Sequence, residues 1–183
     1  MDVRNNIFSN QIVGGNPATP GTRNVAVSLP TGGTAAMDLT WNNNAYFVGD
    51  DALNRLAQVG TTFGSGEFEA GNFDPSQTTP ATNFRSYTST LSADGNNDNA
   101  SFASTTPPPF TSNSDLHIPA DTATRLESGG AAVGVATDID LETRNATTPD
   151  IGADEFTGQP PTANDMAATG LLVPENGETI PTG

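Results

Sequence analysis

The chain has 183 residues, with six Arg, no Lys and 21 acidic residues, which gives a formal net charge of −15. This balance argues against binding to nucleic-acid backbones and to anionic membrane surfaces, because both select clusters of basic residues. No apolar run reaches the roughly 18 residues that a membrane span requires, so no membrane insertion is expected. The absence of Cys excludes disulfides and thiolate chemistry.

Fourteen Pro and 19 Gly predict a chain of short strands and many turns, with few helices. Residues 1–10 are typical of a strand that runs into a turn. No basic and apolar leader precedes them, so we expect a processed chain or a fragment. A second short strand is predicted over residues 24–29. Residues 51–59 are the one predicted helix, because their apolar side chains share one helical face.

Residues 36–47 loosely repeat the opening at an offset of about 36 residues, a spacing typical of stacked repeat units. Both stretches run from Asp and an aliphatic residue to paired Asn and an aromatic residue. Residues 60–111 are irregular, and short strands are predicted around 84–91 and 100–103. The last structured stretch is predicted over residues 115–156.

Four short sequences mark that last stretch. They are Asp-Leu-His-Ile at 115–118, Gly-Gly-Ala-Ala-Val-Gly at 129–134, Asp-Ile-Asp-Leu-Glu-Thr-Arg at 138–144 and Pro-Asp-Ile-Gly-Ala-Asp-Glu-Phe at 149–156. Their order resembles the C-terminal closing segment of right-handed parallel β-helix (pectate-lyase-like) domains in secreted bacterial surface proteins. The paired Asn residues near the start are similar to the turns between that family's strands. Two departures are Leu141, where the family usually has Gly, and Arg-Leu-Glu at 125–127, where Gly-Ser-Pro-Ala is common.

The resemblance implies an all-β fold, a right-handed parallel β-helix of few rungs with long loops and a C-terminal closing segment. Residues 1–157 would form this domain. Residues 158–183 would form a linker and the first strand of an Ig-like or cadherin-like region, or an extended tail. The tail carries an apolar run at 170–174. The family's setting implies an extracellular or cell-surface location.

The acidic residues near the end of this domain have two alternative roles. In the first, a single Arg pins the closing loop through nearby carboxylates, and the structural closing motif is Arg144, Asp150, Gly152, Asp154 and Glu155. In the second, alternating carboxylates share one face and hold Ca²⁺, the one candidate cofactor, through Asp138, Asp140 and Glu142. A second oxygen-rich loop offers Asp94, Asn96 and Asp98, either as a Ca²⁺ site or as a solvated turn.

Other candidate sites are few. Trp41, Tyr46 and Phe47 form either a sugar-stacking platform or part of the core. His117 is the only His, so we expect no His-based metal site, and we assign it a structural role over a catalytic relay with Asp115. The absence of Lys removes Schiff-base chemistry and a Lys general base. Paired carboxylates for glycoside hydrolysis remain open, because 21 acids offer many pairs.

These features favour a non-catalytic fragment of a secreted or cell-surface β-helix protein. Its roles would be adhesion, carbohydrate contact or extracellular assembly. Polysaccharide is one expected partner, and another chain, bound through self-association or strand addition, is the second. The alternative is a polysaccharide lyase or glycoside hydrolase whose active rungs lie partly outside this chain.

Overall fold

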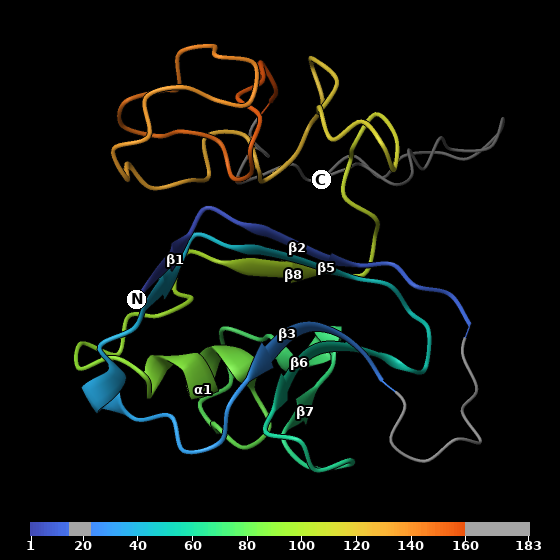
Figure 1. Ribbon diagram of the computed structural model, residues 1–183, viewed down its shortest axis with the longest axis vertical. Coiled ribbons are helices and arrows are strands. Elements are labelled where there is room, and N and C mark those ends of the chain that lie inside the picture. The colour runs from blue at the N-terminus through green and yellow to red at the C-terminus, as the bar shows by residue number, and fades with distance from the viewer. Residues whose placement is uncertain (15–22, 160–183) are drawn as a thin grey trace, which may run out of the picture.

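The computed structural model describes residues 1–14 and 23–159, and within them short strands alternate with long loops (Figure 1). The strands are β1 (Asp2–Arg4), β2 (Ile7–Asn10), β3 (Asn24–Leu29), β4 (Thr40–Asn42), β5 (Ala45–Val48), β6 (Asn54–Val59), β7 (Glu67–Phe68) and β8 (Phe102–Ser104). One α-helix, α1 (Phe84–Ser89), and two 3-10 turns, Ala35–Met37 and Ala70–Asn72, accompany them. The sheet content and scarce helix agree with the all-β expectation.

The strands form three small sheets in which consecutive stretches of chain pair in parallel. β1 pairs with β4, β2 with β5, and β3 with β6, so the second set of three strands repeats the first. Asp2 lies opposite Thr40 and Ile7 opposite Ala45, a spacing of 38 residues in both pairs, close to the predicted offset. These sheets do not amount to a closed or continuous solenoid.

The other edge of the second set is covered by the irregular stretch that follows it. β8 pairs with β5 in parallel, and β7 pairs with β6 in the antiparallel direction. At β4, the backbone of Trp41 bonds to the Asn97 side chain and to the Asp98 N–H. Residues 67–104 therefore supply the backbone partners that this edge would otherwise lack.

Asparagine residues make the turns between the first and second strand of each set. Asn5 has φ 61° and Asn43 has φ 53°, in the left-handed region that Asn tolerates better than most residues. The next residue, Asn44, is fully buried. Its side chain donates to the Val3 carbonyl at 2.9 Å and accepts from the Asn6 N–H at 3.0 Å. These bonds hold the two turns in register.

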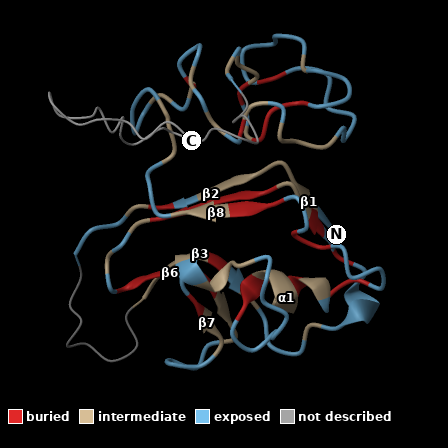
Figure 2. Cartoon of the chain, turned by 180° about the vertical axis from the view of Figure 1, so that it is seen from behind, coloured by how far each residue is buried: buried red, intermediate tan, exposed pale blue. Residues whose placement is uncertain are grey.

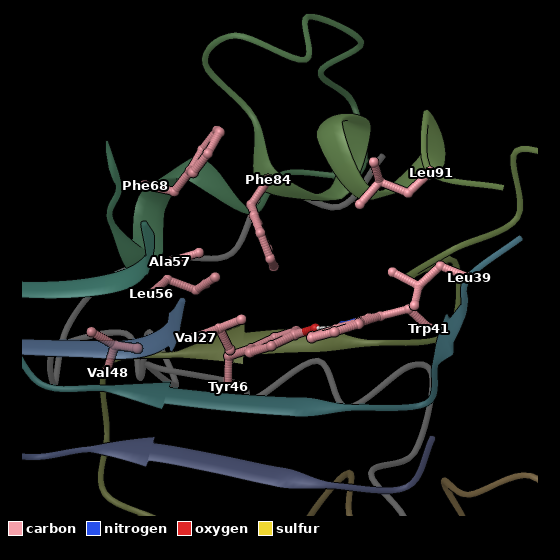
Figure 3. Close-up of a cluster of buried hydrophobic side chains, with 10 residues drawn as sticks. All are labelled: Val27, Leu39, Trp41, Tyr46, Val48, Leu56, Ala57, Phe68, Phe84 and Leu91. Carbon is pink, nitrogen blue, oxygen red and sulfur yellow. Dashed lines mark hydrogen bonds between the residues drawn. The ribbon is translucent and has the colours of Figure 1, made fainter. Parts of the chain in front are cut away.

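Alternation along the central sheet separates two hydrophobic clusters. The inner cluster lies between the three sheets and α1 (Figure 3). Its buried members are Val27, Leu39, Trp41, Tyr46, Val48, Leu56, Ala57, Phe68, Phe84 and Leu91. The outer cluster consists of Ala45, Phe47, Phe102, Ile118, Leu126 and Ile151. The sheet β2-β5-β8 thus contributes buried side chains to both clusters (Figure 2).

The outer cluster is completed by residues 110–159, which we call the closing segment. It lies on the side of the sheet β2-β5-β8 that faces away from β3, β6 and α1 (Figure 1). It contains no strand, only isolated bridges such as Thr137 with Thr143. We expected this segment to close the end of the coil. It covers an outer sheet face instead, because the apolar residues it buries against project from that face.

Two predicted elements are wrong. The stretch predicted as a helix, 51–59, contains strand β6. β6 is paired on both edges and largely buried, so side chains on both of its faces are covered and its sequence lacks the apolar-polar alternation of a half-buried strand. The stretch predicted as a strand at 84–91 contains helix α1, whose N-cap Asn83 accepts from the Ser86 N–H. The predictions at 24–29 and 100–103 are confirmed by β3 and β8, with β8 displaced by one or two residues.

Candidate functional site

The three predicted stacking rings lie inside the protein. Trp41 and Tyr46 point into the inner cluster and Phe47 into the outer one. Their exposed fractions are 4%, 0% and 4%. None of them has a ring face open to a sugar, so the packing alternative describes their position and corrects the idea of a surface platform.

Two of these rings belong to a buried polar network that sequence reasoning did not predict. The Trp41 Nε1–H donates to the Tyr46 hydroxyl at 2.6 Å, and that hydroxyl donates to Asp98 Oδ1 at 2.8 Å. The Thr88 hydroxyl donates to Asp98 Oδ2 at 2.7 Å. Burial raises the pKa of Asp98 to about 6, although these hydrogen bonds oppose the rise. The network specifies how the rings pack around one buried carboxyl group.

This position of Asp98 separates it from the other oxygen-rich residues of its loop. Asp94 is exposed, and its carboxylate accepts from the Asn96 N–H and the Ser92 hydroxyl, which lower its pKa. The Asp98 carboxylate instead points into the core. The predicted cation set Asp94, Asn96 and Asp98 therefore does not converge on one point, and the solvated-turn alternative fits Asp94 and Asn96.

The closing motif is held together largely by bonds between side chains and backbone. Arg144 donates to the carbonyls of Asp150 at 2.7 Å and Gly152 at 3.1 Å, and its Nε lies 3.3 Å from Glu155 Oε2. The Asp150 carboxylate accepts from two backbone N–H groups, those of Ser128 and Phe156. Burial raises the pKa of Asp150 to about 6. Arg144 thus pins the loop through carbonyl oxygens more than through carboxylates.

The predicted calcium residues face different partners. Asp138 is buried and accepts from the backbone N–H groups of Asp140, Glu142 and Glu155. Burial opposes ionisation, but these bonds keep its pKa below the ordinary value. Because its oxygens are already bonded to backbone donors, Asp138 acts as a loop anchor. Glu142 is exposed, and its side chain makes no hydrogen bond within the described residues.

The Asp140 carboxylate contacts the His117 ring and not the other predicted calcium residues. His117 Nε2 lies 2.6 Å from Asp140 Oδ2, and its Nδ1 lies 2.5 Å from Asp115 Oδ1. The bond to Asp115 and then that to Asp140 raise the pKa of His117 to about 9. Asp154 completes this group: one ligand atom from each of His117, Asp140 and Asp154 lies within 4.8 Å of the others. From the sequence we expected no His-based metal site, because there is only one His, and the grouping was not foreseen because these residues come from three separate stretches of the closing segment.

A groove of about 580 Å³ adjoins this cluster and runs beside strand β2. Ile7 and Ser9 of β2 line one side, and Asp154 lies in the opposite wall. Apolar side chains of the closing segment complete that wall, namely Phe110, Leu116, Ile118 and Ile151. Leu116 is half exposed, so apolar surface is open to solvent along the groove.

Backbone groups at the groove face outward. The carbonyls of Asn6 and Asn10 accept from the N–H groups of Ala45 and Gly49, and so point toward β5. Because backbone groups alternate sides along a strand, those of Ile7 and Ser9 point away from β5. Within the described residues β2 has no strand on that side, and the same holds for β1 and β3. The first set of strands therefore presents a free edge, with the groove beside its middle strand.

Comparison with known protein families, curated proteins and solved structures finds no match. Among residues 1–14 and 23–159, no helix is long and apolar enough to cross a membrane. The predicted Ig-like start and the apolar run at 170–174 lie outside the described residues. The features of the described residues that bear on function are the free edge, the groove and the cluster around His117.

Proposed function

We propose that this chain is part of an extracellular parallel β-helix protein that acts in assembly and adhesion, by accepting further strands at the free edge of β1, β2 and β3. The observation that carries the proposal is the repeated parallel pairing of three consecutive strands with the next three. A coil of this kind extends by adding one parallel strand to each sheet. The unpaired backbone of the first set is the surface where such an addition takes place.

The groove favours β2 as the strand where an incoming segment docks. An extended segment beside β2 would bond to the outward backbone groups of Ile7 and Ser9. Its alternate side chains would contact the apolar wall formed by residues such as Leu116 and Ile118. Main-chain bonds of this kind supply affinity, and the apolar wall supplies preference for one register. The incoming strand belongs to a second copy of this coil or to another coil of the same kind.

The charge of the chain sets a condition on this association. At −15, two copies repel each other at low ionic strength, and salt screens that repulsion. We therefore expect self-association to strengthen between about 20 mM and 500 mM NaCl, where the Debye length falls from about 20 Å to about 4 Å. Attraction between basic and acidic patches would show the opposite salt dependence.

The test is sedimentation of the full chain across the micromolar range, at both salt concentrations, with two variants of one residue. Ser9→Pro removes the outward N–H of β2 without touching a bond to β5, and Pro is tolerated on an edge strand. It should weaken self-association at least about tenfold, whereas Ser9→Ala keeps the N–H and should associate like the wild type. Circular dichroism checks that both variants fold. A wild type that stays monomeric in every condition, or a Ser9→Pro variant that associates as well as Ser9→Ala, contradicts the proposal.

A further inference from the structure

We infer that His117, Asp140 and Asp154 bind a divalent transition-metal ion, for which Zn²⁺ is the natural probe. This inference is independent of the proposed assembly. Its first support is the convergence of one imidazole nitrogen and two carboxylate oxygens within 4.8 Å of one another. One nitrogen and two oxygens form a donor set that Zn²⁺ takes in proteins, with a fourth position left for water.

The second support is the orientation of the imidazole ring. Asp115 Oδ1 accepts from the His117 backbone N–H at 3.2 Å and lies 2.5 Å from Nδ1. With Nδ1 bonded to a carboxylate, Nε2 is left to face Asp140 and Asp154. Metal-binding His residues almost always hold their second nitrogen in this way, because the bond fixes the ring and makes the free nitrogen a better donor.

The third support is unused acceptor capacity in a buried acid. Asp154 is 8% exposed, and its single hydrogen bond is from the Ile118 N–H at 2.9 Å. Within the described residues no Arg or His lies within ion-pair distance of it. A buried carboxylate with a single hydrogen bond is costly, since its charge has lost hydration. A divalent ion would bind its remaining oxygen directly.

The neighbouring acids differ from Asp154 in the number of hydrogen-bond donors that their carboxylates already accept. Asp138 accepts three backbone N–H groups, Asp150 accepts two, and Glu155 combines two backbone donors with Arg144. Asp140, in contrast, has His117 as its one side-chain partner, and it is exposed enough to rotate. Among the three buried acids of the closing segment, Asp138, Asp150 and Asp154, acceptor capacity is therefore left over at Asp154, which lies beside the imidazole.

The geometry can adapt to an ion. Four-coordinate Zn²⁺ places its ligand atoms about 3.3 Å apart, so His117 Nε2 and Asp140 Oδ2, now 2.6 Å apart, must separate slightly to admit the ion. Asp154 also lines the groove beside β2, which gives the fourth position access to water. Ca²⁺ takes six to eight oxygen ligands and seldom nitrogen, so this donor set favours a transition metal over the predicted calcium.

The test uses the fact that His117 is the only His in the chain. In a ¹H–¹³C NMR spectrum its imidazole gives one set of signals, which should shift on adding ZnCl₂ and saturate at one equivalent at pH 7.5. Adding CaCl₂ at the same concentration should leave those signals in place. Because Zn²⁺ replaces the proton on Nε2, the apparent affinity should increase with pH.

Variants identify the ligands by calorimetric titration with ZnCl₂. His117→Gln should lower the affinity at least about 100-fold, and Asp140→Asn and Asp154→Asn at least about tenfold each. Asp115→Asn should lower it by about 10- to 100-fold, as expected for a residue that orients the ring. Asp50→Asn, an exposed acid after β5, is the charge-matched control and should bind like the wild type. An absence of saturable Zn²⁺ binding, equal losses in Asp50→Asn and Asp154→Asn, or a response to Ca²⁺ in place of Zn²⁺ would overturn the inference.

Discussion

The region of paired strands among the described residues up to 104, which we call the coil, and the closing segment meet the same physical requirement in different ways. Both must give partners to backbone groups that folding removes from water. In the coil, strands supply those partners to each other. In the closing segment, which has no strand, side-chain carboxylates accept the backbone N–H groups, as Asp138 and Asp150 do. The acidic composition of this segment is therefore largely structural.

The contacts between the two regions also include side chains that bond to backbone groups of the closing segment. Asn5 donates to the Ala131 carbonyl at 2.7 Å and accepts from the Ala131 N–H at 2.8 Å, and Asn43 donates to the Gly129 carbonyl. The turn residues of the coil thus serve as side-chain partners for the segment. Together with the outer hydrophobic cluster, they hold it on the sheet β2-β5-β8. We expect the segment to open more easily than the coil, because it lacks a strand ladder of its own.

The largest effects should come from truncating the two clusters. Leu56 and Leu126 are both fully buried, one in the inner cluster and one in the outer. Leu56→Ala should lower the free energy of unfolding of the whole chain by about 2–5 kcal/mol in urea denaturation. Leu126→Ala should instead raise hydrogen exchange across residues 110–159 while the amides of β5 stay protected.

The control for these truncations is Val135→Ala, which alters an exposed side chain of the same segment and should change stability by less than about 0.5 kcal/mol. If Leu126→Ala deprotected β5 and the segment to the same degree, the two regions would unfold as one unit and the comparison would fail.

An intermediate effect should appear in the pH dependence of stability, since each region buries an acid whose pKa is raised to about 6, Asp98 in the coil and Asp150 in the segment. Such a group stabilises the fold below its unfolded pKa of about 4 and loses that contribution as pH rises through 6. For Asp98 the change is on the order of 2–3 kcal/mol. The free energy of unfolding should therefore fall between pH 4 and pH 6.5.

Asp98→Asn separates the two acids. Thr88 can accept from the new amide because its hydroxyl already has a second acceptor, the Arg85 carbonyl at 3.0 Å. In urea denaturation at a series of pH values, the free energy of unfolding of the variant should fall less between pH 4 and pH 6.5 than that of the wild type. An unchanged dependence of the free energy of unfolding on pH would show that Asp98 titrates alike in the folded and unfolded chain.

At more acid pH, Glu67 changes the free energy of unfolding in the opposite direction. Burial raises its pKa, but bonds from the Gly64 N–H, Arg23 and Arg55 prevail and lower it to about 2. Its contribution is therefore lost as pH falls below 4.5.

The smallest effect, and the only increase in stability, should come from Leu141→Gly. Leu141 is 80% exposed and has φ 68°, in the left-handed region that favours Gly. Removing the side chain relieves backbone strain of about 1 kcal/mol and costs little packing, although the freer unfolded chain offsets part of the gain. We expect a net increase of about 0.5 kcal/mol in thermal or urea denaturation. Leu141→Ala keeps a Cβ and should show less than half of that gain.

Much of the local structure could be predicted from residue types. The paired Asn residues indicate turns because Asn tolerates positive φ, and both Asn5 and Asn43 adopt it. Leu141 also adopts a positive φ, which its residue type does not predict. The start of helix α1 did carry a sequence signal, since Asn83 is a favoured N-cap residue, and its side chain accepts from the Ser86 N–H. Strand β6 carried none, because burial on both faces erases the alternation that identifies a strand.

Residue types alone indicate short strands and Asn turns, and they limit the reactive groups to one imidazole, no Lys and an excess of carboxylates. What each carboxylate faces depends on the folded arrangement of the chain. Asp138 and Asp140 stand two residues apart, yet one is bonded to three backbone N–H groups and the other to His117. The reason is that a carboxylate bonds to the donors that folding leaves without partners, and those donors come from distant parts of the chain.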